Sequence, residues 1–267
     1  GFNDPQKDKP FSRLLRPFRW VWSLGHFQLP LRWADGLNHF LVETRLIFSR
    51  SIILLVAALF IGFLWFTMQE KVNKEDDVYF ILLFQGFFLA ILLNMNLWES
   101  ERESHAFELL IMRIPNVNRL IWFKLRVSLG WAALLSLPFF AGFAFFVGIP
   151  LPRLLGYYVY CLMAMVLVAL LTCIASSFVH HGLTAAIITV IAVYGSFGFL
   201  EGLRQAPFGR YFQIFRYPFQ EDLVRYNLTI LQNAKWIILN RLIMIAAIIG
   251  MYAWLRRRLM KTEKWIG

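Results

Sequence analysis

Glutamate and histidine side chains stand at helical spacing in one charged stretch of the sequence. Glu101, His105 and Glu108 occupy positions i, i+4 and i+7, which places all three on one face of a helix. Such a face is similar to half of the carboxylate and histidine metal site that helical bundles can build. Glu99 and Glu103 flank it, however, and the sequence contains no matching half-site. A solvated helix face explains the cluster better, and we predict no metal ion on this chain.

Two adjacent pairs could also suggest chemistry. Ser104 precedes His105, but neighbouring residues do not face each other on a helix, so they cannot act as nucleophile and base. His180 and His181 are adjacent too, and no third metal ligand stands near them in the sequence. We therefore predict no catalytic residue and do not expect the chain to be an enzyme.

Motifs for energy conversion are missing from the sequence. It contains no G-x-x-x-x-G-K-[ST] loop to hold a nucleotide phosphate. Proton and ion pumps usually keep carboxylates or histidines inside their spans. Here the apolar stretches contain only Glu201 and Arg241, both near predicted ends, besides the boundary histidines. We expect no cofactor on this chain, so nucleotide-driven work would need a partner that binds ATP and Mg²⁺.

The composition predicts an integral membrane protein. Of the 267 residues, 59% are hydrophobic, against roughly 45–50% in soluble domains. The net charge of +11 comes from basic residues beside the apolar runs, a pattern that favours lipid headgroups over nucleic acid. A spanning helix needs about 20 mostly apolar residues, and six stretches qualify: 51–68, 78–98, 127–147, 154–179, 183–203 and 236–255.

The distribution of basic residues predicts the topology. With both termini in the cytoplasm, 18 Lys and Arg residues lie on the cytoplasmic side and 8 on the other. The positive-inside rule favours this orientation. Its weakest point is the basic connection 204–235, whose prolines and aromatic residues suggest a re-entrant segment in the interface.

The two ends of the chain complete the predicted fold. Residues 1–50 contain two basic amphipathic stretches, at 11–24 and from Asp35 onward, which we expect to lie in the membrane plane, although they could instead pack on the spans. Residues 51–259 form the transmembrane domain and 260–267 a cytoplasmic tail. The predicted fold is therefore all-α, with six transmembrane helices, N-terminal interfacial helices and a re-entrant segment before the last span.

The connection after the second predicted span differs from the others. Its first part is a charged helix with an apolar stripe at Phe107, Leu110 and Ile111, ending before Pro115. Such a helix, parallel to the membrane, can dock in a groove of a soluble partner. An ordinary solvated loop is the alternative.

This connection resembles a known family. The order Glu-Arg-Glu at 101–103, Glu-Leu-Leu at 108–110, Pro115, Arg119 and Lys124 is similar to that in permease subunits of type 2 ATP-binding cassette exporters. Ala106-Phe107 stands where that pattern usually has Gly-Thr. The resemblance extends over residues 35–260 and leaves the N-terminal residues without a counterpart.

The resemblance implies partners and a location. The chain would pair with a second permease copy or a related permease, and with two cytoplasmic ATPase subunits, in the plasma (inner) membrane of a bacterium. The coupling segment 99–119 would receive the movement of the ATPase and drive export of an amphiphilic, lipid-linked or drug-like molecule. Residues given this role are Glu101, Arg102, Glu103, Glu108 and Pro115, with Arg119 and Lys124 as anchors at the headgroups.

The predicted substrate path lies on the second and fifth spans. By the same resemblance, these spans would build an aromatic wall from Phe84, Phe87, Phe88, Tyr194, Phe197 and Phe199. Core packing explains these aromatic residues equally well. Gln85, Asn94 and Asn96 could line the path, but polar residues in spans more often form hydrogen bonds between helices.

Two other functions remain open at this stage. One is a membrane-embedded enzyme that modifies lipids, although no paired-Asp motif or histidine cluster stands at a membrane boundary. The other is a structural or assembly subunit of a membrane complex, which would carry out no ATP-dependent transport.

Overall fold

The protein is an all-helical bundle in the part of the chain that its structure describes. A computed structural model describes residues 44, 55–58, 60–62, 75–98, 117–147, 151–179, 181–203, 212, 214–215 and 230–260. Five long helices run through it: α5 (Glu75–Asn94), α8 (Val117–Val147), α9 (Leu151–Phe178), α10 (Gly182–Leu203) and α12 (Ile230–Met260). No strand occurs among the described residues.

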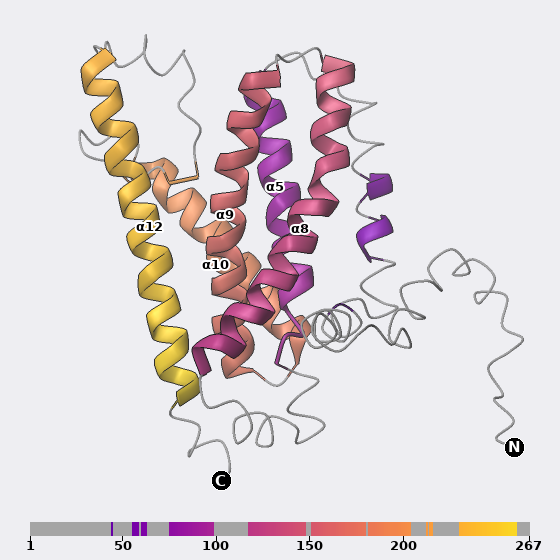
Figure 1. Ribbon diagram of the computed structural model, residues 1–267, viewed down its shortest axis with the longest axis vertical. Coiled ribbons are helices and arrows are strands. Elements are labelled where there is room, and N and C mark those ends of the chain that lie inside the picture. The colour runs from indigo at the N-terminus through magenta and orange to yellow at the C-terminus, as the bar shows by residue number, and fades with distance from the viewer. Residues whose placement is uncertain are drawn as a thin grey trace, which may run out of the picture.

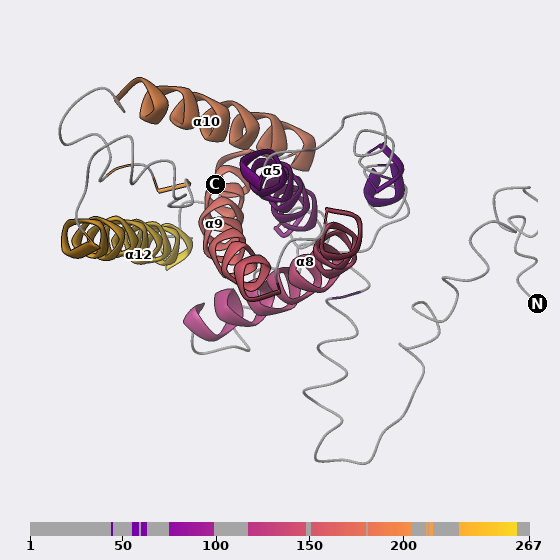
Figure 2. The ribbon, with the colours of Figure 1, turned by 90° about the horizontal axis from the view of Figure 1, so that it is seen from above.

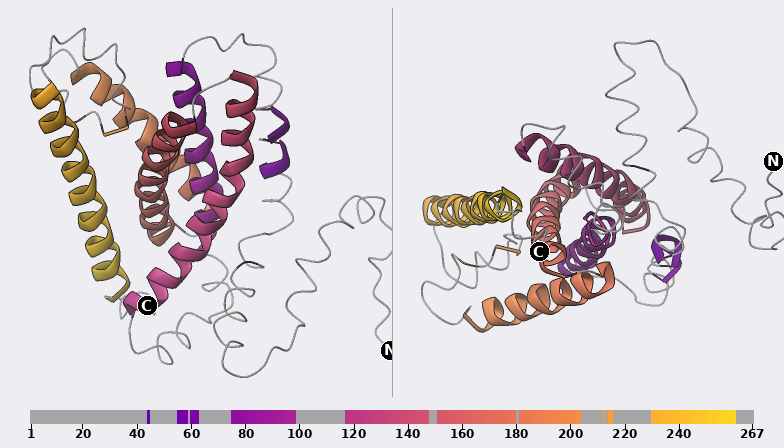
Figure 3. Two further views of the ribbon diagram at one scale, coloured as in Figure 1. Left: turned by 45° about the horizontal axis from the view of Figure 1, so that its top comes forward. Right: turned by 90° about the horizontal axis from the view of Figure 1, so that it is seen from below.

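Helix α9 lies at the centre of the contacts and touches each of the other four helices. Helix α5 packs between α8, α9 and α10, as the view along the bundle shows (Figure 2). Helix α12 meets the N-terminal part of α8 at one end of the bundle and diverges from α8 toward the other end (Figures 1 and 3). We call these the Trp98 end and the Val78 end, after the residues of α5 and its following turn.

In the described part of the chain, four helices are long and apolar enough to cross a membrane: Leu120–Gly142, Leu154–Phe178, Gly182–Leu200 and Lys235–Met260. In lipid, a helix satisfies its backbone hydrogen bonds internally, which is why such apolar runs become helices. The apolar part of α5, Val78–Asn94, is shorter. At 1.5 Å per residue it reaches about 26 Å, somewhat less than the hydrocarbon thickness of about 30 Å.

The predicted spans agree with these helices to different degrees. The stretches 154–179, 183–203 and 236–255 coincide closely with apolar parts of α9, α10 and α12. Most of the predicted span 51–68 lies outside the described residues, and so do the N-terminal segment 1–50 apart from Thr44 and the tail 260–267 apart from Met260. The full set of six spans therefore stays a prediction, as does the re-entrant segment.

Helix α8 begins at Val117, well before the predicted span start at Val127. Three basic residues, Arg119, Lys124 and Arg126, interrupt the apolar run there. Lys124 finds contacts inside the bundle, and the Arg126 guanidinium lies 5.6 Å from the ring centroid of Trp122. Pro138 lies further along α8, where its missing N–H removes a hydrogen bond to residue 134, and α8 bends in its middle (Figure 1).

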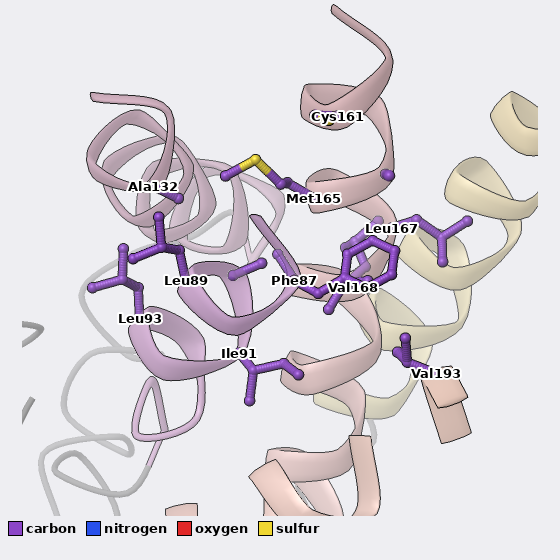
Figure 4. Packing of buried hydrophobic residues seen from close by; sticks show 14 of the residues in the cluster. Phe87, Leu89, Ile91, Leu93, Ala132, Cys161, Met165, Leu167, Val168 and Val193 are labelled. Atoms are coloured by element: carbon purple, nitrogen blue, oxygen red, sulfur yellow. The ribbon is translucent and has the colours of Figure 1, made fainter. Parts of the chain in front are cut away.

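One apolar core joins the helices. It includes side chains of α5, α8 and α9, such as Leu89, Ala132 and Val168, and Figure 4 shows how they gather. Gly86 allows α5 to approach α9 closely, because a Cβ atom there would lie 3.1 Å from Cγ of Met165. Phe215, from the connection between α10 and α12, is buried against Phe87 with ring centroids 5.2 Å apart.

Candidate functional site

Most of the predicted coupling residues precede helix α8. Glu101, Arg102, Glu103, Glu108 and Pro115 lie outside the described residues. Arg119 belongs to the first turns of α8, but its side chain lies outside what the structure describes. The structure does describe the residues that flank this segment: Leu97 and Trp98 after α5, and Lys124 of α8.

Lys124 is buried at the Trp98 end of the bundle, with only 1% of its surface exposed. Its Nζ donates a hydrogen bond to the carbonyl oxygen of Leu97 over 3.5 Å. The same amine lies 5.6 Å from the ring centroid of Trp98, close enough for a cation–π interaction. Lys124 thus joins α8 to the turn that follows α5.

A polar network continues from Lys124 toward α9. The Ser128 hydroxyl, one turn further along α8, donates to Oδ1 of Asn94 over 2.7 Å. The thiol of Cys173 on α9 lies 3.7 Å from that same oxygen. The amide nitrogen of Asn94 donates to the carbonyl oxygen of Ala90 over 2.7 Å. Asn94 therefore has the interhelical role that polar residues in membrane helices usually have.

We call Lys124, Leu97, Trp98, Asn94, Ser128 and Cys173 the helix junction. It contains groups from α5 with its following turn, α8 and α9, and its six residues are buried. Hydrogen bonds in such a low-dielectric environment hold their partners in defined geometry.

The predicted aromatic wall forms where α5 meets α10. The rings of Phe84 and Tyr194 are stacked, with centroids 5.5 Å apart and planes inclined by 6°. Phe197 lies next to both Phe84 and Phe80, at 5.9 Å and 6.0 Å. Tyr194 keeps 44% of its surface exposed. The three rings therefore form a cluster that is partly buried and partly exposed.

The other predicted wall residues are distributed differently. Phe88 and Phe199 are exposed, whereas Phe87 is buried against Phe215. Asn94 lies in the helix junction. The structure thus brings Phe84, Tyr194 and Phe197 together, places the ring of Phe87 edge-on to that of Phe84 with centroids 6.2 Å apart, and separates Asn94 from them.

Gln85 is buried beside this wall without a hydrogen bond. Only 8% of its surface is exposed, and among the described residues neither its Oε1 nor its Nε2 has a hydrogen-bond partner. A buried amide in this state usually destabilises the conformation that contains it by about 1–3 kcal/mol. Of the three polar residues predicted for the path, Asn94 has an interhelical hydrogen bond, Gln85 has none among the described residues, and Asn96 is half-buried in the turn after α5.

Sequence reasoning missed the contacts of two cations, the buried Lys124 and the half-buried Arg241. Besides Lys124, Arg241 of α12 lies over the ring of Tyr160 on α9, 4.2 Å from its centroid. In the sequence, the only sign of this contact was that Arg241 interrupts an apolar run while aromatic residues occur in other spans. Its partner stands too far away in sequence to be identified by spacing.

Metal ligands do not gather in the described part of the chain, where no group of three His, Cys, Asp or Glu residues is close enough to hold an ion. Cys161 and Cys173 are both buried and free.

Comparisons with protein-family models, curated proteins and solved structures found no match for this chain.

Proposed function

We propose that the protein is the membrane-spanning permease subunit of an ATP-binding cassette exporter. The observation that carries this proposal is the helix junction at the base of the charged segment 99–116. The sequence of that segment resembles the ATPase-docking region of such permeases, and Lys124 connects its two ends inside the membrane domain.

The junction suggests how movement would pass into the membrane. A soluble ATPase that displaces the segment would pull on Leu97 and on the start of α8 together, because Lys124 joins them. The Asn94–Ser128 hydrogen bond and the Cys173 contact would carry the displacement to α9. ATP binding can shift the permease from one conformation to the other only if the ATP-bound ATPase binds the two conformations with different affinity. The ATPase must therefore contact the segment differently in each conformation.

The aromatic wall supplies a surface for cargo. Phe84, Tyr194 and Phe197 form a partly exposed aromatic surface where α5 meets α10, suited to the apolar part of an amphiphile. We propose that the six spans, together with those of a second permease copy, enclose a path lined by this wall, with Phe88 and Gln85 beside it. Both termini would be cytoplasmic.

A photo-crosslinking experiment tests the proposal. A photoreactive amino acid placed at Glu103 should capture an ATPase with a Walker motif when membranes of the native host are irradiated. The same amino acid at Glu75, on the opposite predicted side, should capture none. Capture of no ATPase from position 103, with the chain correctly inserted, would contradict the proposed function.

A further inference from the structure

Basic residues gather at the Trp98 end of the bundle. Helices α8 and α12 place six cations there: Arg119, Lys124, Arg126, Arg256, Arg257 and Arg258. In the described residues of this end, no aspartate or glutamate occurs: 94–98, 117–128, 176–179, 181–186 and 250–260. The connection 99–116, outside the described residues, adds four glutamates and two arginines by sequence, so its carboxylates do not outnumber these cations. The Trp98 end therefore suits an anionic partner.

Aromatic rings accompany the cations where α8 meets α12. The ring centroids of Trp122 and Tyr252 lie 5.4 Å apart, and the Tyr252 hydroxyl donates to Oδ1 of Asn118 over 3.4 Å. The Arg126 guanidinium lies 5.6 Å from the ring centroid of Trp122. Since Arg126 follows Trp122 by one turn, its side chain extends back along α8 toward the Trp98 end. An arginine near a membrane boundary extends in this way when its stem lies in the apolar layer and its charge reaches the headgroups.

A second aromatic contact lies between α9 and α12. The ring centroids of Phe178 and Trp254 are 5.3 Å apart, and the Arg258 guanidinium lies 4.7 Å from the centroid of Phe178. Trp254 keeps 41% of its surface exposed, and Trp122 keeps 49%. Exposed tryptophans are typical of the headgroup layer, because the indole ring has an apolar body and a polar N–H.

The lengths of two helices place these tryptophans at a membrane boundary. A hydrocarbon layer of about 30 Å corresponds to about 20 helical residues. Counted from Trp122 along α8, this length ends at Gly142, and counted back from Trp254 along α12, it ends beside Lys235. The apolar parts of the two helices end at these same residues. Two helices that run in opposite directions therefore agree on one boundary at the Trp98 end.

Three arginines at this boundary are accessible to a ligand. Arg126, Arg256 and Arg257 are exposed, and none of them forms an ion pair or a hydrogen bond with another described residue. The planar donors of an arginine can engage two phosphate oxygens at once. Near an anionic lipid surface, each such cation raises the affinity about fivefold.

We propose that the Trp98 end binds the headgroups of anionic phospholipids at an arginine rim, which consists of Trp122, Arg126, Tyr252, Trp254, Arg256 and Arg257. The lipid stays at the surface of the protein and is not cargo, so the inference stands apart from the proposed function. The rim lies where α8 and α12 meet, whereas these helices diverge toward the Val78 end (Figures 1 and 3). A lipid bound there stabilises the folded bundle.

Thermal unfolding of the purified full chain in neutral maltoside detergent tests this inference. Dioleoyl phosphatidylglycerol and dioleoyl phosphatidylcholine share their acyl chains and their phosphate and differ in net headgroup charge. We expect phosphatidylglycerol to raise the unfolding midpoint saturably, as a ligand of the folded state does, and phosphatidylcholine not to do so. In about 1 M NaCl, where the Debye length is about 3 Å, the shift should largely disappear. Glycerol 3-phosphate carries the anion without acyl chains and should give no shift at the concentrations at which phosphatidylglycerol saturates.

Variants locate the binding site. Arg256→Gln combined with Arg257→Gln removes two cations from the arginine rim and should weaken binding of phosphatidylglycerol about twentyfold or more. Arg153→Gln combined with Lys235→Gln removes two cations from the Val78 end and should leave the affinity unchanged. If the rim variant does not fold, the headgroup and salt dependence of the unmodified protein still decides the matter.

Three results would overturn the inference: equal shifts with the two phospholipids, saturation by glycerol 3-phosphate alone, or the same affinity in the two double variants. This assay uses the chain without an ATPase. Its failure would remove the lipid site and leave the photo-crosslinking test at Glu103 to decide the proposed function, and the reverse also holds.

Discussion

The amine of Lys124 and the carbonyl oxygen of Leu97 lie 3.5 Å apart although 27 positions separate the two residues in sequence. Between them in the sequence lies the whole charged segment 99–119, which resembles an ATPase-docking region. A buried lysine therefore joins the turn after α5 to α8 within the helix junction.

Replacing Lys124 should separate folding from coupling. Lys124→Met keeps the aliphatic length and removes the charge, so the hydrogen bond to Leu97 and the contact with Trp98 are lost. We expect the protein to insert in the membrane but to lose most of its stimulation of ATP hydrolysis by the partner. Arg126→Met, which removes an exposed cation two residues further along α8, is the matched control and should behave like the unmodified protein. Equal behaviour of the two variants would remove Lys124 from the coupling path.

Reversing charge in the segment should uncouple the ATPase without unfolding the bundle. Glu101→Lys combined with Glu103→Lys places two cations where the proposed docking helix has two carboxylates. In proteoliposomes, the variant permease should no longer stimulate ATP hydrolysis by the ATPase. Its membrane insertion, measured by protease accessibility, should stay intact. Glu70→Lys with Glu75→Lys makes the same change in charge on the opposite predicted side. Transport that survives in the first double variant would count against the coupling role.

The Asn94–Ser128 hydrogen bond should contribute measurably to stability. In a double-mutant cycle with Asn94→Ala and Ser128→Ala, we expect a coupling energy of about 0.6–2 kcal/mol, the range found for hydrogen bonds between membrane helices. Unfolding in mixed detergent provides the measurement. Additive effects of the two substitutions would mean that the 2.7 Å contact contributes nothing to the folded state.

Gln85 offers a test of the proposed path. Because its amide is buried without a hydrogen bond, Gln85→Leu should stabilise the protein by about 1–3 kcal/mol. The same change should lower transport if the amide contacts cargo, since function often retains residues that destabilise the fold. Asn94→Leu, at a hydrogen-bonded position, should instead destabilise the protein. A Gln85→Leu variant less stable than the parent would refute this assignment.

Gly86 should tolerate only a small side chain. A Cβ atom there would lie 3.1 Å and 3.2 Å from Cγ and Sδ of Met165, so Gly86→Leu should push α5 from α9 and destabilise the protein by about 1–3 kcal/mol. Gly130→Leu is the control, because nothing lies within 4 Å of a Cβ atom at that position. Adding Met165→Ala to Gly86→Leu should recover part of the loss. Thermal unfolding that ranks Gly130→Leu as the more damaging change would contradict this packing.

The sequence predicted the long helices well where no charge interrupts them. The stretches 154–179 and 183–203 closely match α9 and α10, because each is a continuous apolar run. The start of α8 was missed because hydropathy alone treats Arg119, Lys124 and Arg126 as the end of a span. Only the folded bundle shows that Lys124 finds partners beyond α5.

The candidate site was predictable in its residue types but not in its pairing. An aromatic surface on the second and fifth predicted spans was expected, and the stack of Phe84 on Tyr194 brings those two helices together. Phe87, in contrast, is covered by Phe215, whose position depends on the long connection before α12. The stack of Arg241 on Tyr160 likewise joins helices distant in sequence, so periodicity within one helix could not indicate it.

Affinity purification of the full chain from membranes of its native host tests the central claim most directly. We predict that an ATPase with a Walker motif co-purifies in a fixed ratio, and that the complex hydrolyses ATP at a rate that falls when Lys124 is replaced by Met. Two results would contradict the proposal that energy enters through the segment between α5 and α8. The chain could purify without an ATPase, or the rate of ATP hydrolysis by the co-purified ATPase could be unchanged by Lys124→Met.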